Sequence, residues 1–443
     1  MDATALLNIS AILLAFAAVF GWINTKFLKL PMTIGLVLIS LAASMGVIAL
    51  DAMFDLGYSE VARAALNNID FHDSLMIGML HLLLFAGALH TDLDNLLVYK
   101  WHILLMATLG VVISTAVIGI ITYYLVGFFG FEVPFIWCLV FGSLISPTDP
   151  VAVLSIIRTL NVPKNLQTKI AGESLFNDGV GVVVFLALVG IATGGGGHGV
   201  AEAATDGIEV AHAAVASTGG FDATAILKLL FQEVVVGVAI GLVLGYVTFL
   251  AMRSIDDYVV EVIMSLALVM AIYALCSFVH ASGPLGVVVA GLFIGNHGTR
   301  FAMSSVTEEH LEKFWELIDE ILNAVLFLLI GFEILVIPFS QNLIWLVIAI
   351  LPVVLIGRTL AVSVPTGLIR SRGGIVEKGA VPVLIWGGLR GGISVALALS
   401  LPEFEGKSAV LAMTYGVVIF SIVIQGLTVQ RVIAKFVQPA ANE

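Results

Sequence analysis

The sequence predicts an all-α polytopic membrane protein with 13 transmembrane helices, on the basis of its composition, its apolar runs and its basic residues. Hydrophobic residues make up 60% of the 443 residues, charged residues only 11%, and the mean hydropathy is +1.11. A soluble domain carries about 25% charged residues, because water must solvate its surface. The composition therefore excludes soluble enzymes and nucleic-acid binders, and the net charge of −12 indicates no polyanionic partner.

Thirteen apolar runs come close to the roughly 20 residues that a helix needs to cross a bilayer. A lipid-exposed backbone must satisfy its own hydrogen bonds, so each run is predicted to be helical. The first six runs cover residues 5–23, 31–50, 74–90, 103–126, 134–157 and 170–193. The other seven cover residues 229–252, 258–279, 283–297, 314–338, 343–365, 380–400 and 408–434. The loop 194–224 between the two sets begins with four glycines and lacks lysine and arginine, which predicts a flexible linker.

The basic residues predict an external N-terminus and a cytoplasmic C-terminus. In this orientation, 14 of the 19 lysines and arginines fall in cytoplasmic segments and three in external ones. Cytoplasmic loops of membrane proteins carry such an excess. The remaining two, Arg358 and Arg390, fall inside apolar runs. Cys138 and Cys276 also lie in apolar runs, where small buried thiols are more common than disulfides or metal ligands.

The fifth run contains a break with a carboxylate in it, Ser146-Pro147-Thr148-Asp149-Pro150. Prolines remove backbone donors, so two of them three residues apart are expected to interrupt the helix. Asp149 lies eight residues before the end of this run, and Asp178 lies eight residues into the sixth. Since the two runs cross in opposite directions, both aspartates are expected at similar depth. Ionisable groups at such depth are functional candidates, because their burial is costly.

The sixth run carries further polar side chains near Asp178. Ser174 and Asp178 are four residues apart and share a helix face, and Glu173 and Asn177 share the neighbouring face. Carboxylate, hydroxyl and amide oxygens suit a hard cation. Together with the broken helix opposite, they predict a mid-membrane site of the kind found in secondary transporters.

The twelfth run contains a second break, Gly387-Gly388-Leu389-Arg390-Gly391-Gly392. It is the fifth of the last six runs, as the proline break is the fifth of the first six, and one intervening helix gives the two halves opposite orientation. Matching breaks in inverted halves are a sequence sign of a transport site. Arg390 is expected to offset the Asp149 charge and the helix dipoles where the half-helices meet.

Arg358 lies seven residues before the cytoplasmic end of its run. Two interpretations follow from spacing alone: the side chain snorkels to the interface, or it pairs with Glu173 at comparable depth.

The motifs of the fifth and sixth runs, from Ser146 to Val153 and from Gly172 to Asp178, resemble the NhaP/NHE branch of the monovalent cation:proton antiporters. The stretches 388–391 and 423–428 are also similar to that family. The resemblance implies an NhaA-like antiporter fold, with inverted six-helix repeats and two crossed, unwound helices. It implies a homodimer in the cell membrane, with dimerisation segments at 1–100 (spans 1–3) and 194–338 (loop, linker helix 7 and spans 8–10). The core transport segments would be 101–193 (spans 4–6) and 339–443 (spans 11–13), moving as an elevator.

The resemblance also implies roles for individual residues. Asp178 would bind Na⁺ and H⁺ in turn, with Ser174, Asp149, the Thr148 carbonyl and Asn177 completing or bordering the site. Glu173 would pair with Arg358, which favours the second interpretation of that arginine. Relatives that exchange two protons per cation have an aspartate at the position of Asn177, so the resemblance implies one-for-one, electroneutral exchange without a cofactor.

Other functions fit the pattern less well. A K⁺/H⁺ antiporter would have the same fold, and a cation channel would also place carboxylates along a pathway, although channels usually build filters from rings of subunits. An intramembrane aspartyl protease would need a Gly-x-Gly-Asp signature, which Asp178 lacks. A serine hydrolase would need a second glycine after Ser174. The sequence does not rank Na⁺, Li⁺ and K⁺.

Overall fold

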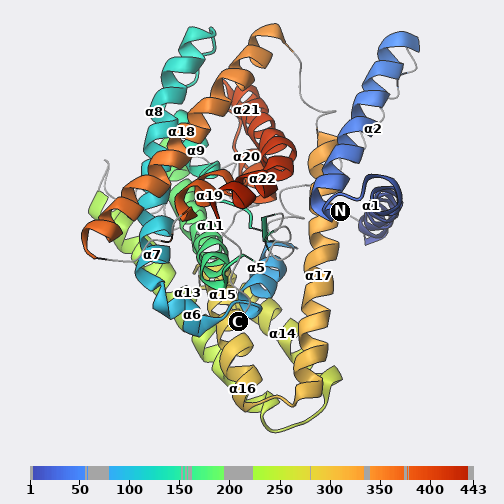
Figure 1. Cartoon of the computed structure of the whole chain (residues 1–443), viewed down its shortest axis with the longest axis vertical. Coiled ribbons are helices and arrows are strands. Elements are labelled where there is room, and N and C mark those ends of the chain that lie inside the picture. The colour runs from blue at the N-terminus through green and yellow to red at the C-terminus, as the bar shows by residue number, and fades with distance from the viewer. Residues whose placement is uncertain are drawn as a thin grey trace.

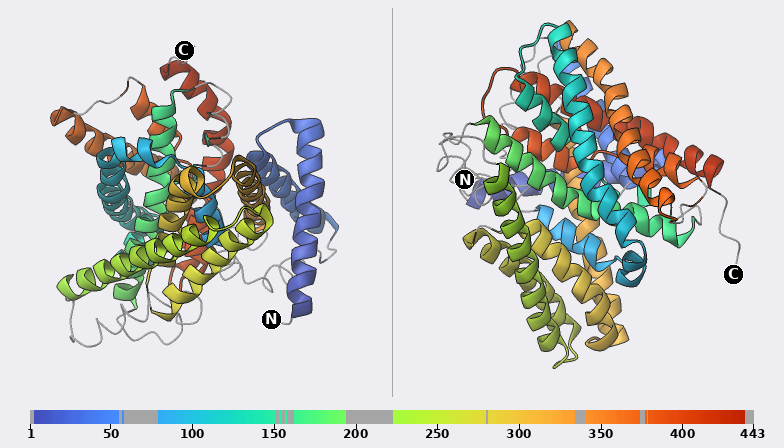
Figure 2. Two further views of the ribbon diagram at one scale, coloured as in Figure 1. Left: turned by 90° about the horizontal axis from the view of Figure 1, so that it is seen from below. Right: turned by 90° about the vertical axis from the view of Figure 1, so that its left-hand side faces the viewer.

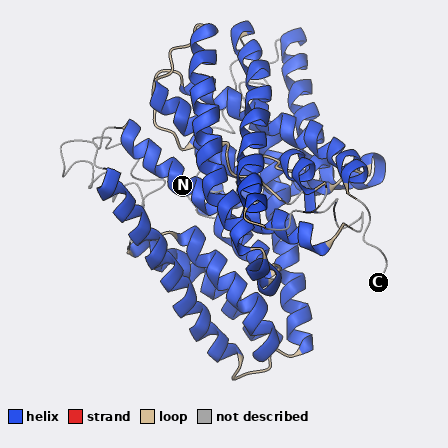
Figure 3. Ribbon diagram, turned by 60° about the vertical axis from the view of Figure 1, so that its left-hand side comes forward, coloured by secondary structure: helices blue, strands red, loops and turns tan. Residues whose placement is uncertain are grey.

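A computed structural model describes residues 3–54, 57, 79–150, 153–154, 157, 162–193, 223–279, 281–333, 340–373, 377 and 379–437. Within these residues the regular secondary structure is helical apart from one isolated β-bridge (Figure 3). Part of the third run, much of the fifth run after residue 150, the loop residues 194–222 and residues 334–338 of the tenth run lie outside the described residues.

Among the described residues before the predicted fourth span there are four α-helices: α1 (Ala3–Ile23), α2 (Met32–Phe54), α5 (Leu80–Leu89) and α6 (Leu93–Val98) (Figure 1). The fourth span is α7 (Lys100–Leu105), a π-turn over Met106–Gly110 and α8 (Val111–Phe128). The helices of the fifth to tenth spans are α9 (Phe135–Leu144), α11 (Lys164–Ala192), α13 (Ala223–Met252), α14 (Tyr258–Phe278), α15 (Gly283–Phe293), α16 (Thr299–Phe301) and α17 (Ser305–Phe332). The chain ends with α18 (Gln341–Ser371), α19 (Ala380–Trp386), α20 (Gly392–Leu399), α21 (Lys407–Phe420) and α22 (Gly426–Phe436).

In the described part of the chain, eight helices are long and apolar enough to cross a membrane, and α5 and α9 are shorter apolar helices. The chain is therefore an all-helical, multi-span protein, as its composition predicts. The predicted fifth and twelfth spans are not among these eight long helices, because both are interrupted. In the fifth, α9 stops at Leu144, and the twelfth divides into α19 and α20. The tenth is missing because the first half of α17 carries many charged residues.

Several helices extend beyond the apolar runs that predict them. α11 begins at Lys164 rather than at residue 170, α17 begins at Ser305 rather than at 314, and α18 continues to Ser371. These extensions are polar, so a hydropathy pattern does not detect them. The N-terminus of α17 is set instead by Ser304, whose side chain accepts a hydrogen bond from the Thr307 amide.

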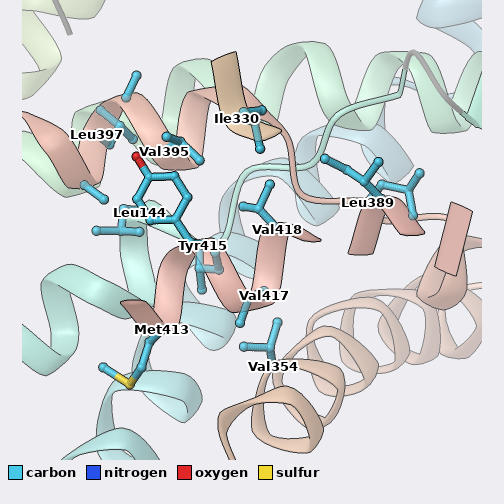
Figure 4. Packing of buried hydrophobic residues seen from close by; sticks show 14 of the residues in the cluster. Leu144, Ile330, Val354, Leu389, Val395, Leu397, Met413, Tyr415, Val417 and Val418 are labelled. Atoms are coloured by element: carbon cyan, nitrogen blue, oxygen red, sulfur yellow. The ribbon is translucent and has the colours of Figure 1, made fainter. Parts of the chain in front are cut away.

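The helices pack in two groups, which Figure 2 shows from two directions. The first group comprises α7, α8, α9, α11 and α18–α22; in it α8 packs on α9 and α18, and α21 packs on α18. The second comprises α1, α2, α5 and α13–α17; in it α15 packs on α5 and α13, and α17 packs on α2, α5 and α14. The core of the first group is tightly filled: Tyr415 of α21, 2% exposed, lies among Leu144, Val395 and Leu397 (Figure 4).

Candidate ion-binding site

Two unwound segments of the first helix group cross beside α11. α9 ends at Leu144, before Pro147 and Pro150, which cannot donate backbone hydrogen bonds to continue it. The segment between α19 and α20 is also extended, and the backbone amide of Asp149 donates to the Leu389 carbonyl at 2.8 Å. This pair is the isolated β-bridge of the described structure. The two breaks that the sequence predicts are therefore joined directly by their backbones.

Two glycines of the second break allow this close approach. A Cβ on Gly391 would lie 2.6 Å from the Asp149 Cβ and 2.9 Å from its carboxyl carbon, which is closer than real carbon contacts allow. A Cβ on Gly388 would lie 2.7 Å from the central carbon of the Arg358 guanidinium. Only residues without a side chain fit at these positions. The glycines thus place Asp149 and Arg358 against the crossing point.

Thr148 is held to the sixth span by two side chains of α11. Asn177 Nδ2 donates to the Thr148 hydroxyl at 2.8 Å, and the Thr148 amide donates to Asn177 Oδ1 at 3.2 Å. The hydroxyls of Thr148 and Ser174 lie 3.0 Å apart. All three side chains are buried. The amide of Asn177 therefore supplies hydrogen bonds that the broken helix cannot supply to itself.

Asp178 lies on α11 next to Asn177 and is 7% exposed. The charged groups that act on it include Asp149 and Arg390, so the structure brings together the two aspartates that the sequence places at similar depth. The Ser174 hydroxyl, one helical turn before Asp178 on α11, and the Thr148 hydroxyl beside it are further oxygen atoms of this region. Oxygen atoms are the ligands that hard cations prefer.

Arg358 of α18 is 6% exposed and forms a buried ion pair with Glu173, which is 2% exposed. Its Nη1 donates to Glu173 Oε1, and its Nη2 donates to Oε2 at 3.1 Å. The same guanidinium donates to the Leu384 carbonyl of α19, from Nε at 3.2 Å and Nη2 at 2.8 Å. Arg358 therefore points into the protein rather than towards the cytoplasmic interface.

Arg390 binds the end of α9, the half-helix of the fifth span. It is 2% exposed, and its Nη1 donates to the carbonyls of Ser146 and Pro147, the latter at 2.9 Å. These carbonyls follow the C-terminus of α9, where a helix carries partial negative charge. Each buried arginine thus binds carbonyls near the C-terminus of one half-helix: Arg358 that of α19 and Arg390 that of α9.

The structure adds residues to which the sequence assigned no role. The backbone amide of Arg390 donates to Ser421 Oγ at 2.9 Å, and Ser421 donates to Gln425 Oε1 at 2.8 Å. Gln425 in turn donates to the Trp386 carbonyl at 3.2 Å, and Trp386 Nε1 donates to Thr428 at 2.9 Å. The 423–428 motif thus binds the unwound segment from the side of α22. In the sequence the motif points to Gln425 and Thr428 alone; Ser421 and Trp386 lie outside it, and no spacing rule indicates them.

A cavity reaches the Glu173–Arg358 pair from the side of α8. Asn177, Ser114 and Arg390 also line it, and the Ser114 hydroxyl has no hydrogen-bond partner among the described residues. Groups of three or more His, Cys, Asp or Glu side chains that could hold a metal are absent from the described residues.

Comparisons with known proteins agree with the resemblance of the motifs. A family model described as "Sodium/hydrogen exchanger, transmembrane" matches residues 13–435. The chain is 45% identical over 436 residues to the Na(+)/H(+) antiporter NhaP of Pseudomonas aeruginosa, with 97% of each chain covered. It is 35% identical over 413 residues to the Na(+)/H(+) antiporter NhaH of Halobacillus aidingensis, with 93% of each covered.

The fold is similar to the structure of the sodium proton antiporter MjNhaP1 from Methanocaldococcus jannaschii at pH 8, with a TM-score of 0.73. The match covers 98% of this chain and 99% of the other at 16% identity, so it shows the fold alone. The family model and the two relatives show more, because they match nearly the whole chain. The chain therefore belongs to the sodium/hydrogen exchanger family of multi-span membrane proteins, which are transporters rather than enzymes and use no cofactor.

Proposed function

We propose that the protein exchanges Na⁺ or Li⁺ for H⁺ across the cytoplasmic membrane by binding the cation and the proton in turn at Asp178. The observation that carries this proposal is the position of Asp178, which is 7% exposed beside two crossed, unwound segments. Ser174, Thr148 and Asp149 supply further oxygens, with Asn177 holding Thr148 in place. Weak oxygen ligation suits an ion that must leave as readily as it binds.

Exchange follows from competition for one carboxylate. A bare charge is costly to move through an apolar barrier, whereas a proton or a cation on Asp178 neutralises it. The loaded site crosses in either form, and the empty, charged site does not. A proton must therefore leave before a cation binds, and this competition couples the two fluxes.

The surrounding charges favour a one-for-one stoichiometry. Glu173 is committed to its ion pair with Arg358. Arg390, which binds the Ser146 and Pro147 carbonyls, supplies a positive charge next to the backbone bridge between Asp149 and Leu389. Asn177 carries no charge and is committed to Thr148. Asp178 is then the single group that alternates between proton and cation, and transport is electroneutral.

We further propose that the two helix groups move against each other. The first group, α7, α8, α9, α11 and α18–α22, is the transport unit and carries every residue of the proposed site. The second group, α1, α2, α5 and α13–α17, is the scaffold and forms the homodimer. This assignment corresponds to core segments 101–193 and 339–443 in a chain of 13 spans with inverted repeats, an external N-terminus and a cytoplasmic C-terminus. An elevator movement of the transport unit would expose Asp178 to each side in turn.

The test is cation-induced dissipation of a trapped pH gradient in vesicles that contain the purified protein. Na⁺, Li⁺ and K⁺ are compared at equal concentration, with Asp178→Asn as the matched control. Na⁺- or Li⁺-driven proton movement that is absent from the control supports the proposal. A response to K⁺ alone would make the protein a K⁺/H⁺ antiporter. Cation flux without proton counterflux would indicate a channel and overturn the proposal.

A further inference from the structure

Three apolar side chains of the scaffold are seated on glycines of the transport unit. Leu326 of α17 lies on Gly392, the first residue of α20: a Cβ there would lie 2.6 Å from both Cγ and Cδ2 of the leucine. Leu285 of α15 lies on Gly179, where a Cβ would approach its Cδ2 to 2.7 Å. Both leucines are buried, at 3% and 8% exposure.

The third contact is made by α2 with the thirteenth span. Ile34 of α2 is fully buried, and a Cβ on Gly426 of α22 would lie 2.9 Å from its Cδ1. The three seats therefore involve three different scaffold helices, and they join the scaffold to α11, α20 and α22.

These three glycines form a distinct set. Every other described glycine that a Cβ would crowd meets a neighbour within its own helix group. Gly388 and Gly391, for example, meet Arg358 and Asp149 inside the transport unit. The three that cross the boundary all lie in the motifs that build the ion site: Gly179 follows Asp178, Gly392 follows Arg390-Gly391, and Gly426 follows Gln425.

We propose that Leu285, Leu326 and Ile34 are positioning residues that hold the transport unit at one height on the scaffold by occupying these glycine notches. This inference rests on the proposed movement of the two groups. A glycine has no Cβ, so it leaves a notch in the helix surface that a side chain of the neighbouring helix can fill. If the transport unit slides along the membrane normal, the leucine or isoleucine must first leave this notch. Packed interfaces of this kind favour discrete positions over continuous sliding.

The three contacts differ in how severely a methyl group added to the glycine would clash with the side chain that fills the notch. At Gly392 the whole isobutyl group of Leu326, Cγ included, stands in the way. At Gly179 only the terminal part of Leu285 does, and rotation of that side chain relieves the contact. Gly392→Ala is therefore expected to displace the transport unit more than Gly179→Ala. Overpacking of this size is expected to lower the population of the seated position by about tenfold.

The test measures the position of the transport unit directly. Spin labels are attached at Phe128, at the end of α8, and Phe278, at the end of α14, which are 81% and 82% exposed. Cys138 and Cys276 are replaced by alanine so that only the two introduced thiols react. Distance distributions in lipid nanodiscs are then compared for the parent, Gly392→Ala and Gly416→Ala. Gly416 is the matched control, because a Cβ there would overlap Val347 within the transport unit.

We expect Gly392→Ala to deplete the distance that this structure gives, and Gly416→Ala to leave it unchanged. Since Gly392→Ala acts through Leu326, adding it to a Leu326→Ala background should have little further effect. Equal distributions for Gly392→Ala and Gly416→Ala would overturn the proposal, and so would an undiminished effect in the Leu326→Ala background.

The same proteins are assayed for Na⁺/H⁺ exchange, which separates this inference from the proposed function. If the parent protein exchanges ions but the distance distribution of Gly392→Ala is unshifted, the proposed role of the glycine contacts is wrong and the proposed function is unaffected. A parent without exchange refutes the function, while its distance distributions still decide whether the notches set the position.

Discussion

Arg358 connects α11 to α19, the first half of the broken twelfth span. Its guanidinium donates to both carboxylate oxygens of Glu173 on α11 and, from the same plane, to the Leu384 carbonyl of α19. Gly388 gives the guanidinium its place, since a Cβ there would overlap it. The pair therefore fixes the relative position of α11, α18 and α19, and with them the position of the crossing segments against Asp178.

Removal of either partner of this pair should destabilise the protein. Glu173→Ala and Arg358→Ala each leave one buried charge unpaired, at a cost of about 3–5 kcal/mol. The double variant should lose less than the sum of the two losses, which thermal unfolding in detergent would measure. The exposed pair Arg300–Asp94 is the control, because solvent-exposed pairs contribute little. Additive losses at Glu173 and Arg358 would contradict an interaction between them.

Asp178→Asn should abolish exchange without unfolding the protein. The amide has nearly the shape of the carboxylate, but it neither releases a proton nor supplies a full charge to a cation. Exchange in vesicles should fall to the level of protein-free vesicles, while the melting temperature of the purified variant stays close to that of the parent. Residual coupled exchange would remove Asp178 from the proposed role.

Exchange should not respond to membrane voltage. If Asp178 alone alternates between proton and cation, the loaded transport unit carries the same charge in both directions. The rate in vesicles should then be equal under K⁺/valinomycin diffusion potentials of either sign. Rates that shift systematically with the potential, in the absence of a leak, would show that a second charge moves, with Asp149 as the first group to examine.

Arg390→Lys should lower stability even though the charge is kept. An ammonium group does not reproduce the planar fork with which a guanidinium binds acceptors, so the carbonyl of Ser146 or Pro147 should lose its donor. An unsatisfied buried acceptor costs about 1–3 kcal/mol. Arg431→Lys on the exposed side of α22 is the control and should unfold at the temperature of the parent.

The sequence predicts where the helices break more reliably than where they end. Pro147 and Pro150 remove backbone donors, and Gly387, Gly388, Gly391 and Gly392 favour neither helix nor strand, so composition alone indicates both interruptions. Helix ends in the polar regions leave no such mark, because the charged first half of α17 is helical beyond the apolar run.

Contacts between helices depend on information that spacing does not contain. Arg358 fits both an interfacial and a paired position in the sequence, because depth in the membrane says nothing of the direction in which a helix face points. The fold places that face towards α11 and α19. Asn177 is comparable: its position beside Asp178 is visible in the sequence, but its hydrogen bonds to Thr148 depend on how the broken fifth span approaches α11.

The backbone bridge between Asp149 and Leu389 has a consequence for the two sides of the membrane. Because it joins the crossing segments directly, the oxygens around Asp178 would keep their arrangement during the proposed movement of the transport unit. A cation would then lose its water once, on loading, and would meet the same ligands whichever side it came from. The intrinsic preference among Na⁺, Li⁺ and K⁺ should therefore be identical on both faces. The apparent affinity for an ion should differ between the two sides only through the fraction of molecules that face each side. The ratio of the two apparent affinities should therefore be the same for Na⁺, Li⁺ and K⁺.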